Sequence, residues 1–140
     1  MKLAQALKEK SRLKKEIADL REKLELYARA EQKTGESPKK LLLNLEESLR
    51  RMEYLTTAIY HTNDVITVDG KTMTQWIYTR DTLFFRLELY KKLIRLSADS
   101  ENPSELNLTE LEIKAERMKE EIRTLSDMIQ KTNWEKELIE

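Results

Sequence analysis

The second half of this 140-residue chain repeats the first half at a constant offset of 70 residues, without a gap. The clearest match joins residues 55–63 to residues 125–133, which share Leu, Ile, Thr and Asn at the same spacing. Such a repeat constrains the fold strongly, because each half must then build a similar unit. It predicts one helical domain, residues 1–140, made of two similar hairpins, residues 1–70 and 71–140.

Apolar residues recur in alternating steps of three and four through most of both halves, which is the spacing of a helix seam. Leu13, Leu55, Leu83 and Leu125 are typical members of these stripes and are expected in the core. The stripes predict four helices, over residues 3–31, 37–64, 72–96 and from 109 onwards. The fold class is therefore all-α, with two long helical hairpins forming a four-helix bundle or a coiled-coil-like assembly. A more extended pair of hairpins that closes only by oligomerising is the alternative.

Local signals mark the turn within the first hairpin and the connection between the two hairpins. Gly35, after Gln-Lys-Thr, can take the left-handed conformation that stops a helix, and Ser37 can cap the next helix. Between the hairpins, β-branched residues flank Asp69-Gly70, a pair that favours a two-residue turn. A short β-ribbon or turn is expected around residues 65–72.

Two capping boxes mark the helix starts of the second half. In such a box, the first and fourth side chains each bond the other residue's backbone N–H. The two sequences are Thr72-x-x-Gln75 and Thr109-x-x-Glu112. The polar run over residues 97–107 is expected to be the loop between these helices.

The composition limits the possible functions. Lys plus Arg and Asp plus Glu number 26 each, so there is no strong field to attract nucleic acid. There is no cysteine for thiol chemistry, and the one histidine, His61, lacks the Glu-x-x-His pattern of a di-iron bundle. With no phosphate loop and no zinc spacing, we expect a non-enzymatic protein without cofactor or metal. The absence of a membrane span or signal sequence favours a cytoplasmic location.

The helix predicted to begin at Thr72 carries a second apolar row on a face other than its seam. A helix that is apolar on two sides must bury both. We interpret the row as a candidate subunit interface of a homo-oligomer; a helix wrapped by the chain's own partners is the alternative. The row consists of Tyr78, Phe85, Leu89 and Leu96.

In an up-and-down bundle, several polar and aromatic residues would meet at one end. Polar seam residues often only fix register, long basic side chains can reach solvent, and asparagine can stop a helix. The alternative is a site for a small anion or carboxylate, built from paired amides and two cations. If Arg80 were buried against Asp81 or the asparagines, its truncation would cost roughly 3–5 kcal/mol. The candidate ligand-binding residues are Lys10, Asn63, Trp76, Arg80, Asp81, Asn133 and Trp134.

Several segments resemble the septicolysin-like family of small bacterial helical proteins. They are the N-terminal Met-Lys-Leu-Ala-Gln-Ala-Leu, the Asp69-Gly-Lys-Thr-Met-Thr stretch and the Asn133-Trp134 ending. The family usually has a longer loop before the last helix, where this chain retains only Leu-Asn-Leu-Thr. The family name implies a membrane-active cytolysin, although its members are broadly uncharacterised.

These observations favour an oligomeric helical scaffold or binding module. The competing functions are a small-ligand binder at the polar end and a membrane-active protein of the septicolysin-like kind. The sequence names neither the partner nor the ligand.

Overall fold

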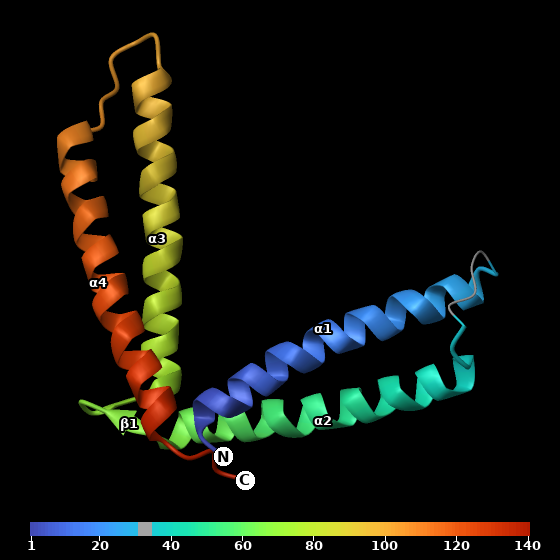
Figure 1. The fold of residues 1–140 in the computed structure, drawn as a ribbon. Helices are drawn as coiled ribbons and strands as arrows, with labels where there is room; N and C mark the ends of the chain where they lie inside the picture. The colour runs from blue at the N-terminus through green and yellow to red at the C-terminus, as the bar shows by residue number, and fades with distance from the viewer. Residues whose placement is uncertain (31–34) are drawn as a thin grey trace. The chain divides into compact units, whose positions relative to one another are not determined.

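The computed structural model describes residues 1–30 and 35–140 and is built of four long helices and one short ribbon (Figure 1). Its helices are α1 (Leu3–Ala28), α2 (Pro38–Val65), α3 (Met73–Asp99) and α4 (Leu108–Glu135). Strands β1 (Thr67–Val68) and β2 (Lys71–Thr72) form an antiparallel pair. The all-α class, the two helical hairpins and the ribbon are confirmed. No helix in the described part of the chain is long and apolar enough to cross a membrane.

The chain divides into two compact units, each containing one hairpin. The first unit comprises Met1–Asn63 and Asn133–Glu140, and the second comprises Asp64–Thr132. Their limits fall about seven residues before the boundaries of the sequence repeat, because each unit includes the segment that leads into its hairpin.

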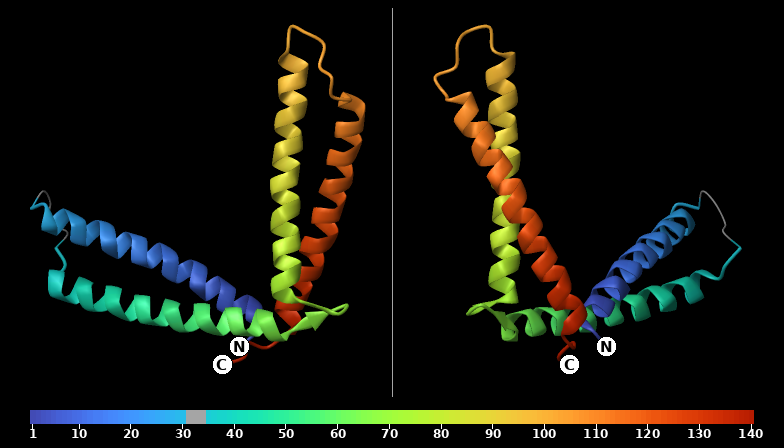
Figure 2. Two further views of the ribbon diagram at one scale, coloured as in Figure 1. Left: turned by 180° about the vertical axis from the view of Figure 1, so that it is seen from behind. Right: turned by 60° about the vertical axis from the view of Figure 1, so that its left-hand side comes forward.

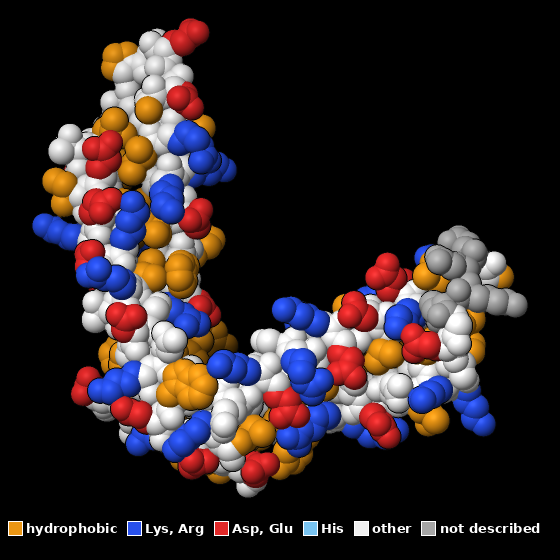
Figure 3. All heavy atoms as spheres, viewed as in Figure 1, with side chains coloured by type: hydrophobic (Ala, Val, Ile, Leu, Met, Phe, Trp, Pro, Cys, Tyr) orange, Lys and Arg blue, Asp and Glu red, His pale blue; other side chains and the backbone are white. Residues whose placement is uncertain are grey.

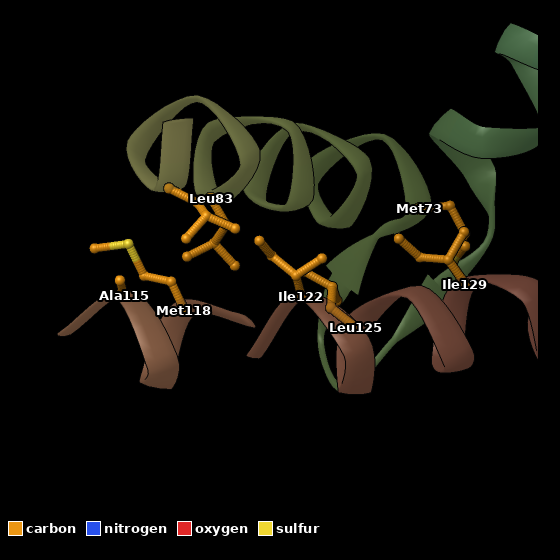
Figure 4. Packing of buried hydrophobic residues seen from close by; sticks show 8 residues of the cluster. Met73, Leu83, Ala115, Met118, Ile122, Leu125 and Ile129 are labelled. Carbon is orange, nitrogen blue, oxygen red and sulfur yellow. The ribbon is translucent and has the colours of Figure 1, made fainter. Parts of the chain in front are cut away.

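Each unit has its own hydrophobic core, and equivalent positions of the repeat fill both. Leu13 and Leu83 are both buried, as are Leu55 and Leu125, which confirms the predicted stripes. In the second unit, Figure 4 shows side chains of α3 and α4 pointing toward one another. Its cluster consists of Met73, Leu83, Leu87, Ala115, Met118, Ile122, Leu125 and Ile129. The cluster of the first unit consists of Leu3, Ala6, Leu13, Leu55, Ala58, Ile59 and Leu138.

The β1–β2 ribbon has the predicted turn. Asp69 and Gly70 have φ of +50° and +80°, as the two-residue turn between right-twisted strands requires. Thr72 then caps α3 with the predicted box, since its backbone N–H donates to Gln75 Oε1 at 2.9 Å and its Oγ1 accepts the Gln75 N–H at 3.1 Å. The Met73 N–H donates to the Ile66 carbonyl at 2.9 Å, which ties the ribbon to the start of α3.

The first unit contains a counterpart of this ribbon, made from the two ends of the chain. Lys2 pairs antiparallel with Glu137, 70 residues before Thr72 and 70 after Thr67 respectively. The Leu3 N–H donates to the Lys136 carbonyl at 2.9 Å, as Met73 does to Ile66. We call residues 1–3 and 136–138 the terminal ribbon. Both views of Figure 2 show the two chain ends together beside the start of α1.

Helix α1 ends earlier than predicted. It stops at Ala28, and the first left-handed residue after it is Ala30, with φ of +54°. Gly35 is left-handed as expected, but it lies in the loop and does not terminate the helix. Lys23 on α1 donates to the carboxylate of Glu36, which lies just before α2, at 2.7 Å. The predicted extension to Glu31, and residues 32–34, lie outside the described part.

Two boundaries in the second hairpin also differ from prediction. Helix α3 continues to Asp99, so the loop begins three residues later than expected. Helix α4 begins at Leu108 and is capped by Asn107, whose Oδ1 accepts the Glu110 N–H at 3.1 Å. The predicted cap at Thr109 is wrong because Asn is the stronger capping residue and Asn107 also has a Glu three residues later.

At the start of α2, the predicted Ser37 cap is present, since its Oγ accepts the Lys40 N–H at 3.4 Å.

Candidate functional site

The second apolar row of α3 lies at the surface. We call it the α3 row: Tyr78, Phe85, Leu89 and Leu96 are 69%, 71%, 45% and 56% exposed. The same helix buries Leu83 and Leu87 on its opposite face, against α4. Figure 3 shows hydrophobic side chains reaching the surface along this hairpin. These exposures favour the interface interpretation over a row wrapped by the chain's own helices.

The equivalent face of α1 has a different composition. Positions 70 residues earlier are occupied by Lys8, Lys15, Asp19 and Leu26. The two helices have the same length to within one residue and bury equivalent core positions. A helix in this setting therefore folds with charges on that face, so folding alone does not require the apolar side chains of α3.

The predicted polar residues are divided between the two units. Lys10, Asn63, Asn133 and Trp134 belong to the first unit, in which Lys8 lies 4.6 Å from the centre of the Trp134 ring. The Lys10 ammonium lies 5.5 Å from the centre of the Tyr60 ring. Asn63 is buried, and its Oδ1 has no hydrogen-bond partner among the described residues.

In the second unit, Arg80 and Asp81 form an ion pair at the surface. Their charged atoms are 3.5 Å apart, with side chains 28% and 57% exposed. The Arg80 Nε is buried and has no partner among the described residues. Trp76 donates its indole N–H to the Val68 carbonyl at 2.8 Å and lies beneath the Lys71 ammonium. Each tryptophan thus contacts a lysine that the sequence analysis did not single out.

A groove that the sequence analysis missed runs between α3 and α4 in the second unit. Its volume is about 490 Å³, and Leu83, Leu125 and Met128 contribute apolar surface to it. Carboxylates are present as well, from Asp69, Glu120 and Glu121. Trp76, Thr79 and Thr124 complete the lining.

In the first unit, an ion pair stands at positions equivalent to two groove residues. Arg51 binds Glu9 through two hydrogen bonds of 2.9 and 3.2 Å, where the second repeat has Glu121 and Thr79. The bonds from Arg51 hold the pKa of the Glu9 carboxyl below its ordinary value. The replacement of this ion pair by Glu121 and Thr79 is visible in the sequence, but it does not by itself predict a groove.

With the geometry described, the family can be assigned. A family model matches residues 10–138, which is nearly the whole chain. The chain belongs to DUF6847, a family of unknown function. It is also similar to the crystal structure of a functionally unknown conserved protein from Corynebacterium diphtheriae, with a TM-score of 0.89 and 28% identity over 99% of both chains. No curated protein matches it.

Neither the DUF6847 assignment nor the geometry supplies a reaction. In residues 1–30 and 35–140, no group of three or more His, Asp or Glu side chains is placed to hold a metal ion. His61 is exposed on α2. The features that stand out in this DUF6847 chain are the α3 row, the groove beside it and two buried polar atoms.

Proposed function

We propose that this DUF6847 protein is a cytoplasmic, non-enzymatic scaffold or binding module that acts as a homo-oligomer through the α3 row. The observation that carries the proposal is the exposed row itself, because large apolar side chains that are exposed together commonly mark a surface that another chain covers. The charged residues at the equivalent positions of α1 support it, since they show that this face can be polar in the same kind of hairpin.

The test is the mass in solution of the wild-type protein and the Phe85→Glu variant. A charge in the centre of the row should disperse the oligomer without unfolding it, because Phe85 contributes little to the core of its own hairpin. Sedimentation velocity gives the mass, and circular dichroism verifies the helices. Lys15→Glu, at the equivalent position of α1, is the matched control and should leave the mass unchanged. A wild-type protein that stays monomeric at all concentrations would refute the proposal.

A small-ligand binder is the second candidate, supported by the buried Asn63 Oδ1 and Arg80 Nε atoms without partners. Buried polar atoms are usually satisfied. An anion would accept the Arg80 Nε–H, and a donor group of a ligand would bond the Asn63 Oδ1. Native mass spectrometry of the protein purified gently from its source should then show a reproducible extra mass. The mass should disappear in Arg80→Met or Asn133→Ala variants that still fold.

The resemblance to the septicolysin-like family suggests membrane activity as a third candidate. Its test is the release of dye from liposomes at micromolar protein concentration. Release that scales with protein would favour this function over the scaffold.

A further inference from the structure

We infer that two copies of the chain pair through their α3 rows in antiparallel orientation, with the two-fold axis crossing the seam between Phe85 and Leu89, at the height of residue 87. Tyr78 of each copy then faces Leu96 of the other, and Phe85 faces Leu89. This inference rests on the proposed function and specifies its partner and its geometry.

The spacing of the α3 row is symmetric about its centre. Its steps are seven, four and seven residues, so the pairs Tyr78/Leu96 and Phe85/Leu89 are both centred on position 87. A two-fold axis across an antiparallel helix pair brings together residues that are equally distant from that centre. The row is therefore complementary to itself in one orientation, as a two-fold interface must be.

The row also runs along one line of the helix. Tyr78 and Leu89 are 11 residues apart, as are Phe85 and Leu96, and 11 residues make almost exactly three helical turns. The side chains consequently form a straight seam about 27 Å long, at 1.5 Å per residue. A straight seam can contact an identical seam over its whole length.

The sizes of the side chains favour the antiparallel orientation. Each aromatic ring of one copy would meet a leucine of the other, so every contact along the seam has a similar volume. A parallel pair would instead place Tyr78 on Tyr78 and Leu96 on Leu96, with bulky contacts at one end and smaller contacts at the other. The antiparallel pair therefore fills the space between the two helices more evenly along the seam, as close packing requires.

Charges beside the row point to the same orientation. Asp81 and Lys92 are both exposed and lie on the same flank of the row. The symmetry about position 87 brings Asp81 of one copy next to Lys92 of the other, twice per dimer. Lys92 makes no ion pair within the described residues, and Asp81 has only the 3.5 Å contact with Arg80. A parallel pair would place this flank of one copy against the opposite flank of the other, so Asp81 and Lys92 would not meet.

Cysteine cross-linking tests the orientation, because the chain has no cysteine of its own. Tyr78→Cys and Leu96→Cys variants are oxidised mildly, first separately and then as an equimolar mixture, and the experiment is repeated with a short bis-maleimide linker. We expect the mixture to give covalent dimers at least several-fold faster than either variant alone. Dimers that form equally fast in the separate variants would overturn the antiparallel register.

Charge reversal gives a second measurement that does not depend on the reach of a cross-link. Asp81→Lys should weaken the dimer roughly 2- to 30-fold, as expected for two exposed ion pairs. The double variant Asp81→Lys/Lys92→Asp should recover the wild-type Kd. A double variant as weak as the single variant would contradict the pairing.

The outcomes separate this inference from the proposed function. If Phe85→Glu disperses the oligomer while the cross-links join like positions, the scaffold proposal stands and the antiparallel register is wrong. If the wild-type protein is monomeric, both fall. Protection of the row only in the presence of a different protein would likewise refute the pairing of two copies.

Discussion

The two hairpins share their cores and differ on one outer face. Leu13 and Leu83, Leu55 and Leu125, and Ile59 and Ile129 are buried at equivalent positions. On the outer face, Lys8 and Lys15 of α1 correspond to Tyr78 and Phe85 of α3. The shared positions are those that a helical hairpin needs to fold. The face that differs is therefore not required for folding, and under the proposed function it serves self-association.

The ends of the hairpins teach a related lesson. The Lys2 N–H donates to Gln5 Oε1 at 2.8 Å, and the Thr72 N–H donates to Gln75 Oε1 at 2.9 Å. The same backbone-to-glutamine bond and the same kind of ribbon thus precede α1 and α3, although only Thr72 also accepts the glutamine N–H through its side chain. One ribbon is a continuous turn, and the other joins the two chain ends. The ribbon before each helix is therefore retained in both repeats, although only the β1–β2 ribbon is made of one continuous segment.

The largest expected effect concerns the shared core. Leu83→Ala and Leu13→Ala should each cost roughly 2–5 kcal/mol of unfolding free energy, because each leaves a cavity in the core of its hairpin. Urea unfolding measures both, with Leu89→Ala on the exposed row as a control that should change the monomer little. A loss below half a kcal/mol in either core variant would remove that leucine from its core.

The next largest effect concerns the hydrogen bond between Thr62 and the segment that follows the terminal ribbon. Thr62 Oγ1 is buried, donates to the Ala58 carbonyl at 2.7 Å and accepts the Ile139 N–H at 2.8 Å. Thr62→Val should cost about 1–3 kcal/mol, since it leaves that N–H without an acceptor. Amide exchange at Ile139 should accelerate as well.

The matched variant at the equivalent position is Thr132→Val. Thr132 Oγ1 donates to the Met128 carbonyl at 2.9 Å, and no backbone N–H of the described residues donates to it. Its loss should be below about 1 kcal/mol. Equal losses in the two variants would show that the Ile139 bond does not hold the terminal ribbon.

A smaller effect is expected at Arg80. Because its partner Asp81 is mostly exposed, the pair should contribute at most about 1 kcal/mol, which is less than the 3–5 kcal/mol of a buried pair. Arg80→Met keeps the packing of the stem and removes the unpartnered Nε, so thermal unfolding should be unchanged or slightly raised. Lys10→Met is the equivalent control, and a melting temperature lowered by many degrees in Arg80→Met alone would contradict this description.

The smallest effect depends on pH. Hydrogen bonding from Arg51 lowers the pKa of Glu9 below its ordinary 4.5, so the pair stabilises the first hairpin at higher pH. This contribution, below about 1 kcal/mol for a pair near the surface, is lost as the pH falls below 4.5 and through the lowered pKa. Thermal unfolding between pH 6 and pH 3 should show a shallower loss in Glu9→Gln than in the wild type. Identical slopes would mean that the pair contributes nothing.

The sequence predicted the elements of the fold well because their signals are local. These signals are the three-four spacing of apolar residues, the Ser37 cap, the Thr72 capping box and the Asp69-Gly70 turn. Each acts within a few residues of the structure that it specifies. The early end of α1 was missed because the left-handed residue that follows it is Ala30, whereas glycine or asparagine is the usual signal for that conformation. The cap at Asn107 was missed because two overlapping capping sequences compete there.

The candidate site was less predictable. The exposed α3 row could be located because apolar periodicity on a second face is a local signal. The groove could not, because it depends on which side chains of α3 and α4 meet across the hairpin. The polar residues were grouped on the assumption that the two hairpins pack as one bundle. Within the units, the two tryptophans contact Lys8 and Lys71, which that grouping did not include.

Hydrogen–deuterium exchange at two protein concentrations tests the contrast between the hairpins most directly, because it reads α1 and α3 in the same unmodified molecule. Covering the α3 row stabilises that helix against local opening, and opening governs exchange. We predict that peptides spanning residues 78–96 gain protection as the concentration rises, while those spanning residues 8–26 do not change. Protection that is independent of concentration in both segments, or that increases only in residues 8–26, would contradict the account.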